Sequence, residues 1–417
     1  MELVTDNFFS EYLDFDSLPD RKTIYLTYWG SLPSAEIKYS GKKLLIRYHD
    51  KEIERVHIKF NKVVKVLIFV IQGNPVDYDE QYIKHHQGHV TVETPEVYEL
   101  NNILLALSDS FHQTNFKMHS IGEYFSEVER WFSPFIEHEI FRKLKNANYY
   151  SFVENGAAYV FVNDEIKKSD IYKGFRANDE IKENIKLLED FAKKSNFREF
   201  YKAHNSYYLK LGELFRVESQ PEKIWQWLES NFPEKYQSYK VFFSPLGPGN
   251  HSARMFTNSD FKETIMFISG PNRYFEKSES PSVNSIKLSR SFFTEIDHAY
   301  VNPTSNKYVE NINAVLNNLK PWYKGGGYNK PYLVFNEYMT WAVFSLFTLD
   351  NYSDDNYQFS KSYIEKFMQE NKGFYKFKEF NNELTRLYKL KSEEEKIVDL
   401  YPEILNWIKI ESNAASP

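Results

Sequence analysis

The chain contains no cysteine. This absence excludes disulfide bonds, a thiol nucleophile and every zinc site that depends on cysteine ligands. It is compatible with a cytoplasmic protein and equally with an exported bacterial one. Any metal site or catalytic group must therefore be built from histidine, carboxylate and hydroxyl side chains.

Positive charge is not in excess either. The 417 residues include 52 Lys and Arg against 58 Asp and Glu, which gives a formal net charge of −6. Proteins that bind nucleic acids normally carry a basic surface that neutralises phosphates. The composition therefore predicts no nucleic-acid partner.

Long apolar runs are also missing. No segment reaches the ~18 consecutive apolar residues of a membrane helix. The richest short run, residues 63–71, is β-branched and of strand length. Residues 1–6 show no basic region followed by an apolar core. We therefore expect neither a membrane span nor a signal peptide in this sequence.

Aromatic residues, in contrast, are abundant. They make up 18% of the chain, with 35 Phe and 31 Tyr. Side chains of this size bury large apolar areas, so the composition predicts a globular protein without extensive disorder. The length suffices for two or three domains with sizeable cores.

The hydrophobic pattern predicts an α+β protein. Short alternating segments separated by Gly, Pro, Ser and Asp predict a β-rich N-terminal module over residues 1–94. From residue 95 the apolar spacing becomes helical, which predicts a second, mainly helical domain over residues 95–417. Within it, two β-branched and aromatic runs predict a small sheet near residues 239–270.

The most informative segment is residues 294–298, Thr-Glu-Ile-Asp-His. It matches the zinc-protease helix motif His-Glu-x-x-His except that Thr294 replaces the first histidine. In the intact motif two histidines one helical turn apart bind zinc, and the glutamate activates a metal-bound water. Here Glu295 and His298 remain, together with Asp297, in an otherwise apolar helix that we expect to end at Asn302 and Pro303. Buried ionisable groups are costly unless they pair or bind a metal, which favours a functional cluster.

A second predicted helix supplies a partner for this motif. Residues 335–344 are apolar except for a single acid, Glu337. A zinc site needs a further ligand from outside the motif, and Glu337 on a second buried helix is the first candidate. An i, i+3 pair such as Glu295 and His298 also occurs in di-iron bundles, but those need a second Glu-x-x-His, which the chain lacks.

At these residues the chain resembles a family. Residues 293–303 and 336–338 are similar to segments of a poorly characterised bacterial family of zincin-like domains, which are candidate metallopeptidases of the gluzincin type. Residues 97–107 and 244–251 resemble further landmarks of that family, so the resemblance extends over roughly residues 95–350. It implies that Glu295 is the general base and that His298 and Glu337 are zinc ligands. It also implies a peptide or protein substrate and favours an exported, periplasmic or envelope location.

Thr294 is the departure from the family pattern. A threonine hydroxyl is a weak zinc ligand, and catalytic zinc sites normally have three protein ligands plus water. Asp297 and His251 are candidates to replace the lost ligand. Tyr328, which follows the glycine run at residues 325–327, is a candidate oxyanion donor on a mobile loop.

Two functions therefore remain open at the level of the sequence. One is zinc-dependent peptide hydrolysis with a degenerate motif. The other is a catalytically inactive zincin-like protein that binds a peptide or an envelope partner, with Glu295, Asp297 and His298 kept as a buried polar cluster. Another zinc hydrolase activity, such as that of an amidase, is a third possibility. We expect the histidines at positions 85, 86 and 89 to lie in an exposed loop.

Overall fold

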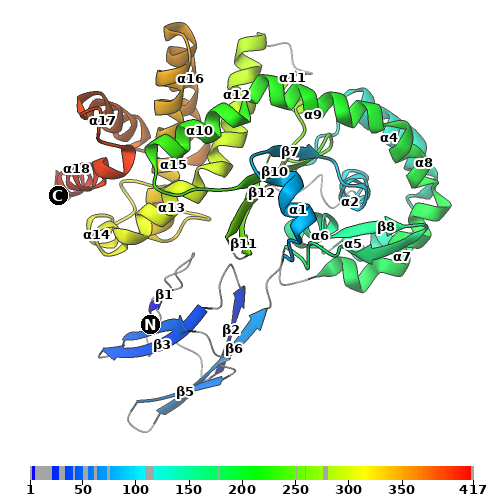
Figure 1. The fold of residues 1–417 in the computed structure, drawn as a ribbon, viewed down its shortest axis with the longest axis horizontal. Coiled ribbons are helices and arrows are strands. Elements are labelled where there is room, and N and C mark those ends of the chain that lie inside the picture. The colour runs from blue at the N-terminus through cyan, green and yellow to red at the C-terminus, as the bar shows by residue number, and fades with distance from the viewer. Residues whose placement is uncertain are drawn as a thin grey trace. The chain divides into compact units, whose positions relative to one another are not determined.

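The computed structural model describes residues 76–108, 117–145, 147–175, 179–249, 251–258, 260–275 and 280–414, and before them the strands at 2–4, 21–27, 33–40, 43–49, 55–60 and 63–72. The chain divides into two compact units (Figure 1). Unit 1 comprises residues 1–211 and 236–270, and unit 2 comprises residues 212–235 and 271–417. The predicted domain boundary near residue 94 stays a prediction.

The N-terminal part of unit 1 is β-rich, as predicted. Strands β1 (Glu2–Val4), β3 (Pro33–Ser40) and β4 (Lys43–His49) form one three-stranded sheet in the order β1-β4-β3. Strands β2 (Arg21–Thr27), β5 (Arg55–Phe60) and β6 (Val63–Gln72) form a second one in the order β2-β6-β5. The β-branched run at residues 63–71 is the central strand of the second sheet.

A four-stranded mixed sheet lies in the same unit. Its order is β11-β12-β10-β7, with β7 (Val90–Glu93), β10 (Ser238–Ser244) and β12 (Phe261–Ser269) parallel and β11 (Ser252–Asn258) antiparallel at one edge. Every residue of β10 is buried, as expected for a central parallel strand with a continuous apolar run. Strands β10 and β12 lie where the sequence predicted a small sheet; both are internal, and β11 and β7 are the two edge strands.

Helices complete unit 1 (Figure 1). Their core consists of apolar side chains on α2 (Glu96–Ala106), α4 (Gly122–Phe132) and α7 (Glu180–Lys194). Leu100, Phe132 and Phe191 are examples, and none of them is measurably exposed. The other elements of this part are α1 (Glu80–His86), η2 (Ser133–Phe135), α5 (Glu139–Leu144), α6 (Tyr149–Gly156), the hairpin of β8 (Tyr159–Val162) and β9 (Glu165–Lys168), α8 (Phe197–Ala203) and the start of α9 (Asn205–Ser219).

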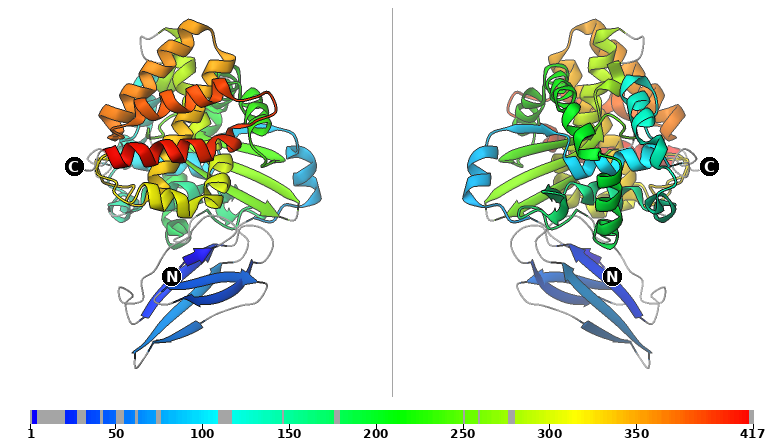
Figure 2. Two further views of the ribbon diagram at one scale, coloured as in Figure 1. Left: turned by 90° about the vertical axis from the view of Figure 1, so that its left-hand side faces the viewer. Right: turned by 90° about the vertical axis from the view of Figure 1, so that its right-hand side faces the viewer.

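The regular elements described in unit 2 are all helices. At its centre is α15 (Pro331–Asn351), which is apolar on all sides and buried from Val334 to Thr348, as a helix surrounded by others must be. Around it are α10 (Pro221–Asn231), α11 (Asn272–Phe275), α12 (Pro281–Ile296), α13 (His298–Lys307), α14 (Val309–Val315), α16 (Asp354–Lys366), the π-helical turn η3 (Phe367–Lys372), α17 (Phe377–Leu390), η4 (Ile397–Leu400) and α18 (Tyr401–Ala414). Figure 2 shows α17 and α18, orange-red and red, side by side.

One predicted boundary is wrong. The helix expected to end at Asn302 and Pro303 instead ends at Ile296, and α13 begins at His298 and continues through Pro303 to Lys307. Proline disfavours the helical conformation in the residue before it but does not forbid it. The Asn302 carbonyl accepts a hydrogen bond from the Tyr332 hydroxyl on α15 (3.3 Å), a tertiary contact that the local pattern does not reveal.

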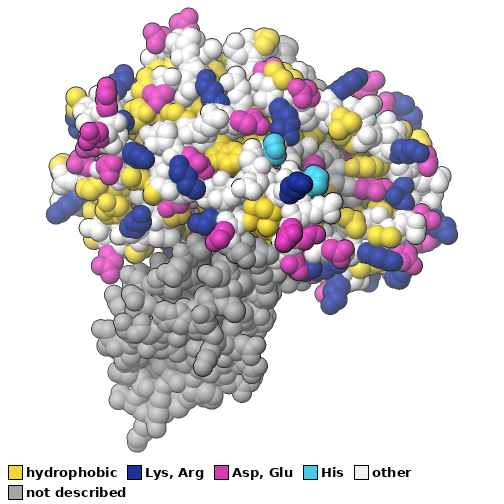
Figure 3. Space-filling model, viewed as in Figure 1, with side chains coloured by type: hydrophobic (Ala, Val, Ile, Leu, Met, Phe, Trp, Pro, Cys, Tyr) yellow, Lys and Arg dark blue, Asp and Glu magenta, His cyan; other side chains and the backbone are white. Residues whose placement is uncertain are grey.

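None of the helices in the described part of the chain has the length and hydropathy needed to cross a membrane. On the face shown in Figure 3, basic and acidic side chains of the described residues are interspersed rather than segregated. This distribution agrees with the balanced composition of the chain.

Candidate functional site

The two predicted helices bring His298 and Glu337 together in unit 2. Thr294 and Glu295 lie in the last turn of α12, Asp297 joins α12 to α13, and His298 is the first residue of α13. Glu337 lies in the first half of α15. Nε2 of His298 is 3.8 Å from Oε1 of Glu337, which is an ion-pair distance and too long for a hydrogen bond. The other ring nitrogen, Nδ1, lies 3.4 Å from the side-chain oxygen of Asn302.

Glu337 has two further partners. Nζ of Lys372, at the end of η3, lies 3.5 Å from Oε2 of Glu337. The hydroxyl of Tyr328 hydrogen-bonds to the same carboxylate, and burial together with Glu337 raises the pKa of Tyr328, so this hydroxyl keeps its proton and donates. The loop that carries Tyr328 is fixed at its start, where the backbone N–H of Lys324 donates to the carbonyl of Gly373 (2.9 Å).

Asp297 is the most deeply buried acid of the motif, with no exposed surface. Neither of its carboxyl oxygens has a hydrogen-bond partner of standard geometry. Burial raises the pKa of Asp297 well above its ordinary value, and the neighbouring Glu295 and Glu337 raise it further, while the backbone N–H of His298 offsets part of the effect. The surroundings of Asp297 therefore favour its neutral, protonated form over a third anion in the site.

Thr294 does not take the place of a ligand. It is 5% exposed, and its hydroxyl donates back along α12 to the carbonyl of Arg290 (3.0 Å), a common arrangement for a threonine within a helix. Glu295 is partly exposed. Its charge contributes to the raised pKa values of Asp297 and Tyr328.

These side chains do not fit a catalytic zinc ion. Zinc ligands in a tetrahedral site lie about 3.3 Å apart at bond lengths of ~2.0–2.1 Å, and His298 and Glu337 come near that spacing. A third ligand is missing, because no three His, Asp or Glu side chains among the described residues are grouped so that they hold a metal ion. The ammonium of Lys372 also lies against Glu337, where a cation bound to this carboxylate would be repelled.

His251 belongs to unit 1, so the structure does not test its predicted place beside His298. Its Nε2 lies 3.2 Å from the hydroxyl oxygen of Ser269 at the end of β12. That hydroxyl donates to the carbonyl of Pro248. In this arrangement His251 helps to fix the Gly- and Pro-rich loop between β10 and β11.

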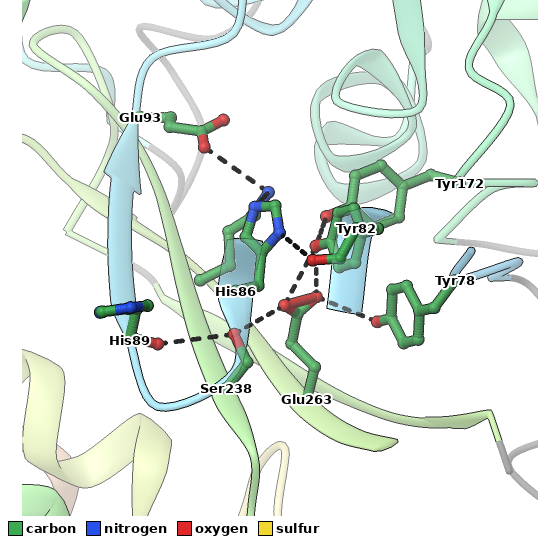
Figure 4. Close-up of polar contacts among 9 residues, drawn as sticks. Tyr78, Tyr82, His86, His89, Glu93, Tyr172, Ser238 and Glu263 are labelled. Carbon is green, nitrogen blue, oxygen red and sulfur yellow. Dashed lines mark hydrogen bonds and ion pairs between the residues drawn. The ribbon is translucent and has the colours of Figure 1, made fainter. Parts of the chain in front are cut away.

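A buried polar cluster that the sequence did not reveal surrounds Glu263 of β12 (Figure 4). Its carboxylate has no exposed surface and accepts hydrogen bonds from the hydroxyls of Tyr78 (3.0 Å), Tyr82 (2.7 Å) and Ser238 (2.9 Å). Because Tyr82 gives its single hydroxyl proton to Glu263, Tyr172 must donate to the Tyr82 oxygen (2.6 Å).

Lys240 of β10 extends this cluster with a buried positive charge. It is 4% exposed, and its ammonium lies 5.0 Å from the ring centroid of Tyr82, 3.2 Å from Nε2 of His86 and 3.5 Å from Glu93. Nδ1 of His86 donates to the carbonyl of Tyr82 (2.8 Å), so Nε2 accepts from Lys240. The expected exposed loop is confirmed for His89, but His85 and His86 belong to α1; His85 is exposed, whereas His86 is half-buried and takes part in this cluster.

A second buried acid in unit 1 is Glu99, on α2. One of its oxygens accepts a hydrogen bond from Tyr124 (2.7 Å), whose hydroxyl oxygen lies 2.7 Å from that of Tyr208, and Ser244 supplies a further hydrogen bond. The other oxygen is buried without a partner. Burial raises the pKa of Glu99 to about 8, and the hydrogen bonds only partly oppose this.

Comparison of the chain with models of protein families, with curated proteins and with solved structures finds no match. The resemblance to zincin-like domains therefore depends on the motif residues themselves.

Proposed function

We propose that this chain is a zincin-like protein that binds a peptide at the site formed by α12, α13 and α15 and does not hydrolyse it. The observation that carries the proposal is the 3.5 Å approach of the Lys372 ammonium to Glu337. In a metalloenzyme the charge of this carboxylate is neutralised by the metal. Here a lysine neutralises it, which removes the need for a metal.

The site retains groups suited to binding. Glu337 is held in place by Tyr328 and Lys372, and His298 is oriented by Asn302 through Nδ1. This leaves Nε2 of His298 and the carboxylate of Glu337 as a polar pair with fixed orientation, able to hydrogen-bond the amide groups of a ligand directly or through water. That the ligand is a peptide follows from the resemblance to the zincin-like family.

The test is the metal content of purified protein that has been equilibrated with zinc and then dialysed. We expect far less than one zinc per chain, and no cleavage of fluorescently labelled casein. The variants His298→Ala and Glu337→Ala serve as controls for adventitious metal, since their zinc content should equal that of the parent protein.

A result of about one zinc per chain, lost in both alanine variants, would overturn the proposal and favour metal-dependent hydrolysis. The variant Thr294→His provides a positive control for the remaining ligands. By restoring the histidine of the motif it should raise the affinity for zinc. If Thr294→His binds zinc and the parent protein does not, residue 294 is the position that prevents metal binding in this chain.

A further inference from the structure

Arg290, one helical turn before Thr294, has no anionic partner among the described residues. The Arg290 guanidinium is centred 5.0 Å from the ring of Trp341 and 5.9 Å from that of Phe367. Its Nε atom is buried and has no hydrogen-bond partner. Within the described part of the chain no carboxylate forms an ion pair with this guanidinium, although Arg carries five N–H donors.

No anion among the described residues compensates the partly buried charge of Arg290. Stacking on aromatic rings stabilises a guanidinium but does not use its in-plane donors, and of those the buried Nε of Arg290 has no partner. Partial burial of an unpaired cation costs free energy that an anion in the plane of the guanidinium would recover. An arginine stacked in this way is already oriented, so a ligand has little side-chain entropy to remove when it binds.

A second cation lies over the same indole. Nζ of Lys372 is 5.2 Å from the ring centroid of Trp341, and Phe367 stacks on that ring at 5.4 Å with an interplanar angle of 18°. We call Arg290, Trp341, Phe367 and Lys372 the Trp341 cluster. Lys372 already neutralises Glu337, so Arg290 supplies the unmatched positive charge of the cluster.

The backbone is irregular where it supplies two members of the cluster. Phe367 and Lys372 are the first and last residues of the π-helical turn η3, which ends at Gly373 with a left-handed φ of 77°. Such turns are less stable than α-helix and occur often at functional sites. A β-carbon at Gly373 would approach side-chain atoms of Lys324 to 2.2 Å, so this position accepts only glycine without rearrangement.

We propose that the Trp341 cluster binds a carboxylate of the peptide ligand, with the Arg290 guanidinium as the main donor and Lys372 as the second. The planar guanidinium matches a planar carboxylate through paired N–H donors. Glu337, which lies 3.5 Å from the Lys372 ammonium, disfavours a ligand with more negative charge, such as a phosphate dianion. The inference rests on the proposed function, whose ligand it narrows to a peptide that presents a carboxylate at this position.

The experiment uses the full chain and two random heptapeptide pools with acetylated N-termini, one with a free C-terminal carboxylate and one with a C-terminal amide. Bound peptides are recovered by affinity selection and identified by mass spectrometry. We expect carboxylate-bearing peptides to be enriched about tenfold or more over those without one. Enrichment confined to the free-acid pool identifies the terminal carboxylate, and enrichment of Asp- or Glu-containing peptides in both pools identifies a side-chain carboxylate.

The variants Arg290→Gln and Lys372→Gln, checked for folding by circular dichroism, should lose this preference. Lys366→Gln removes an equal charge from a position 73% exposed on α16 and should keep it. Peptide binding without any carboxylate preference, or a preference that survives in Arg290→Gln, would overturn the proposal. If no peptide is bound, N-acetylglycine is titrated while tryptophan fluorescence is followed. A response absent from Arg290→Gln would then support the carboxylate site and reject only the peptide function, and no response would reject both.

Discussion

The ammonium of Lys372 lies 3.5 Å from Oε2 of Glu337, on the carboxylate that the zincin-like motif assigns to a metal. Thr294 and Lys372 therefore both disfavour the binding of a metal ion at this site. Compared with the zincin-like motif, Thr294 stands where that motif has a histidine ligand, and Lys372 supplies a positive charge where the motif would have a metal ion. An organic cation and a metal ion compete for the same carboxylate, which leads to the first prediction.

In a Thr294→His background, the further substitution Lys372→Met should raise the affinity for zinc by about tenfold or more, because a cation near a divalent metal is repelled in a partly buried site. Competition with a chromophoric chelator measures the affinity. Lys366→Met in the same background is the matched control and should have little effect, since Lys366 is well exposed. Equal affinities in all three proteins would show that Lys372 does not oppose metal binding.

The contact between Lys372 and Glu337 could not be predicted from the sequence, whereas the local elements could. The α+β architecture and the sheet near residues 239–270 are confirmed, because alternating and helical apolar periods are properties of short segments. Lys372 and Glu337 are separated in the chain and meet through the π-helical turn η3, whose period matches neither the helix nor the strand pattern. The Glu263 cluster was missed for a similar reason, since Tyr78 and Glu263 are 185 positions apart.

The buried Glu99 should make unit 1 less stable as the pH rises. Its pKa is raised to about 8 in the folded protein, against an ordinary value of 4.5, so the native state binds the proton more tightly. The associated stability is complete below about pH 4.5 and is lost as the pH rises towards 8. Glu99→Gln should therefore raise the free energy of unfolding of unit 1 at pH 7 by on the order of 2 kcal/mol. It should also abolish the decrease of this free energy between pH 5 and pH 8.

Hydrogen exchange of β10 amides at pH 5, 6, 7 and 8, corrected for intrinsic exchange rates, gives a readout specific to unit 1. The matched control is Glu165→Gln on the exposed hairpin β8–β9, whose side chain is 63% exposed. It should leave the pH dependence unchanged. If the protection of β10 amides depends on pH in Glu99→Gln as it does in the parent protein, a group other than Glu99 causes the pH dependence.

Removing the acceptor at the centre of the Glu263 cluster should destabilise unit 1 strongly. Glu263→Ala leaves the buried hydroxyls of Tyr78, Tyr82 and Ser238 without their acceptor, and we expect a loss of about 3 kcal/mol or more. Tyr172→Phe removes only one donor from the edge of the cluster and should cost about 1 kcal/mol. Urea unfolding followed by tyrosine near-UV circular dichroism provides the measurement, and similar losses in the two variants would contradict this account.

His86 should make α1 sensitive to acid. Burial lowers the pKa of His86 and the Lys240 ammonium lowers it further, while the Tyr82 carbonyl and the acids Glu93 and Glu263 oppose the shift. Because the folded state binds this proton less tightly than the unfolded state, the native contacts of α1 weaken as the pH falls below the unfolded value of about 6.5. Protonation also removes the acceptor that Nε2 offers to the Lys240 ammonium (3.2 Å).

Hydrogen exchange of α1 amides between pH 7 and pH 5 tests this prediction, again with correction for intrinsic rates. Protection should fall with acidification in the parent protein and stay nearly constant in His86→Gln, which cannot take up the proton. His85→Gln is the matched control, because His85 is exposed and its Nδ1 contacts only the carbonyl of Gln81 (2.7 Å) among the hydrogen bonds of the described residues. A loss of protection of the same size in all three proteins would place the acid sensitivity outside the contact between His86 and Lys240.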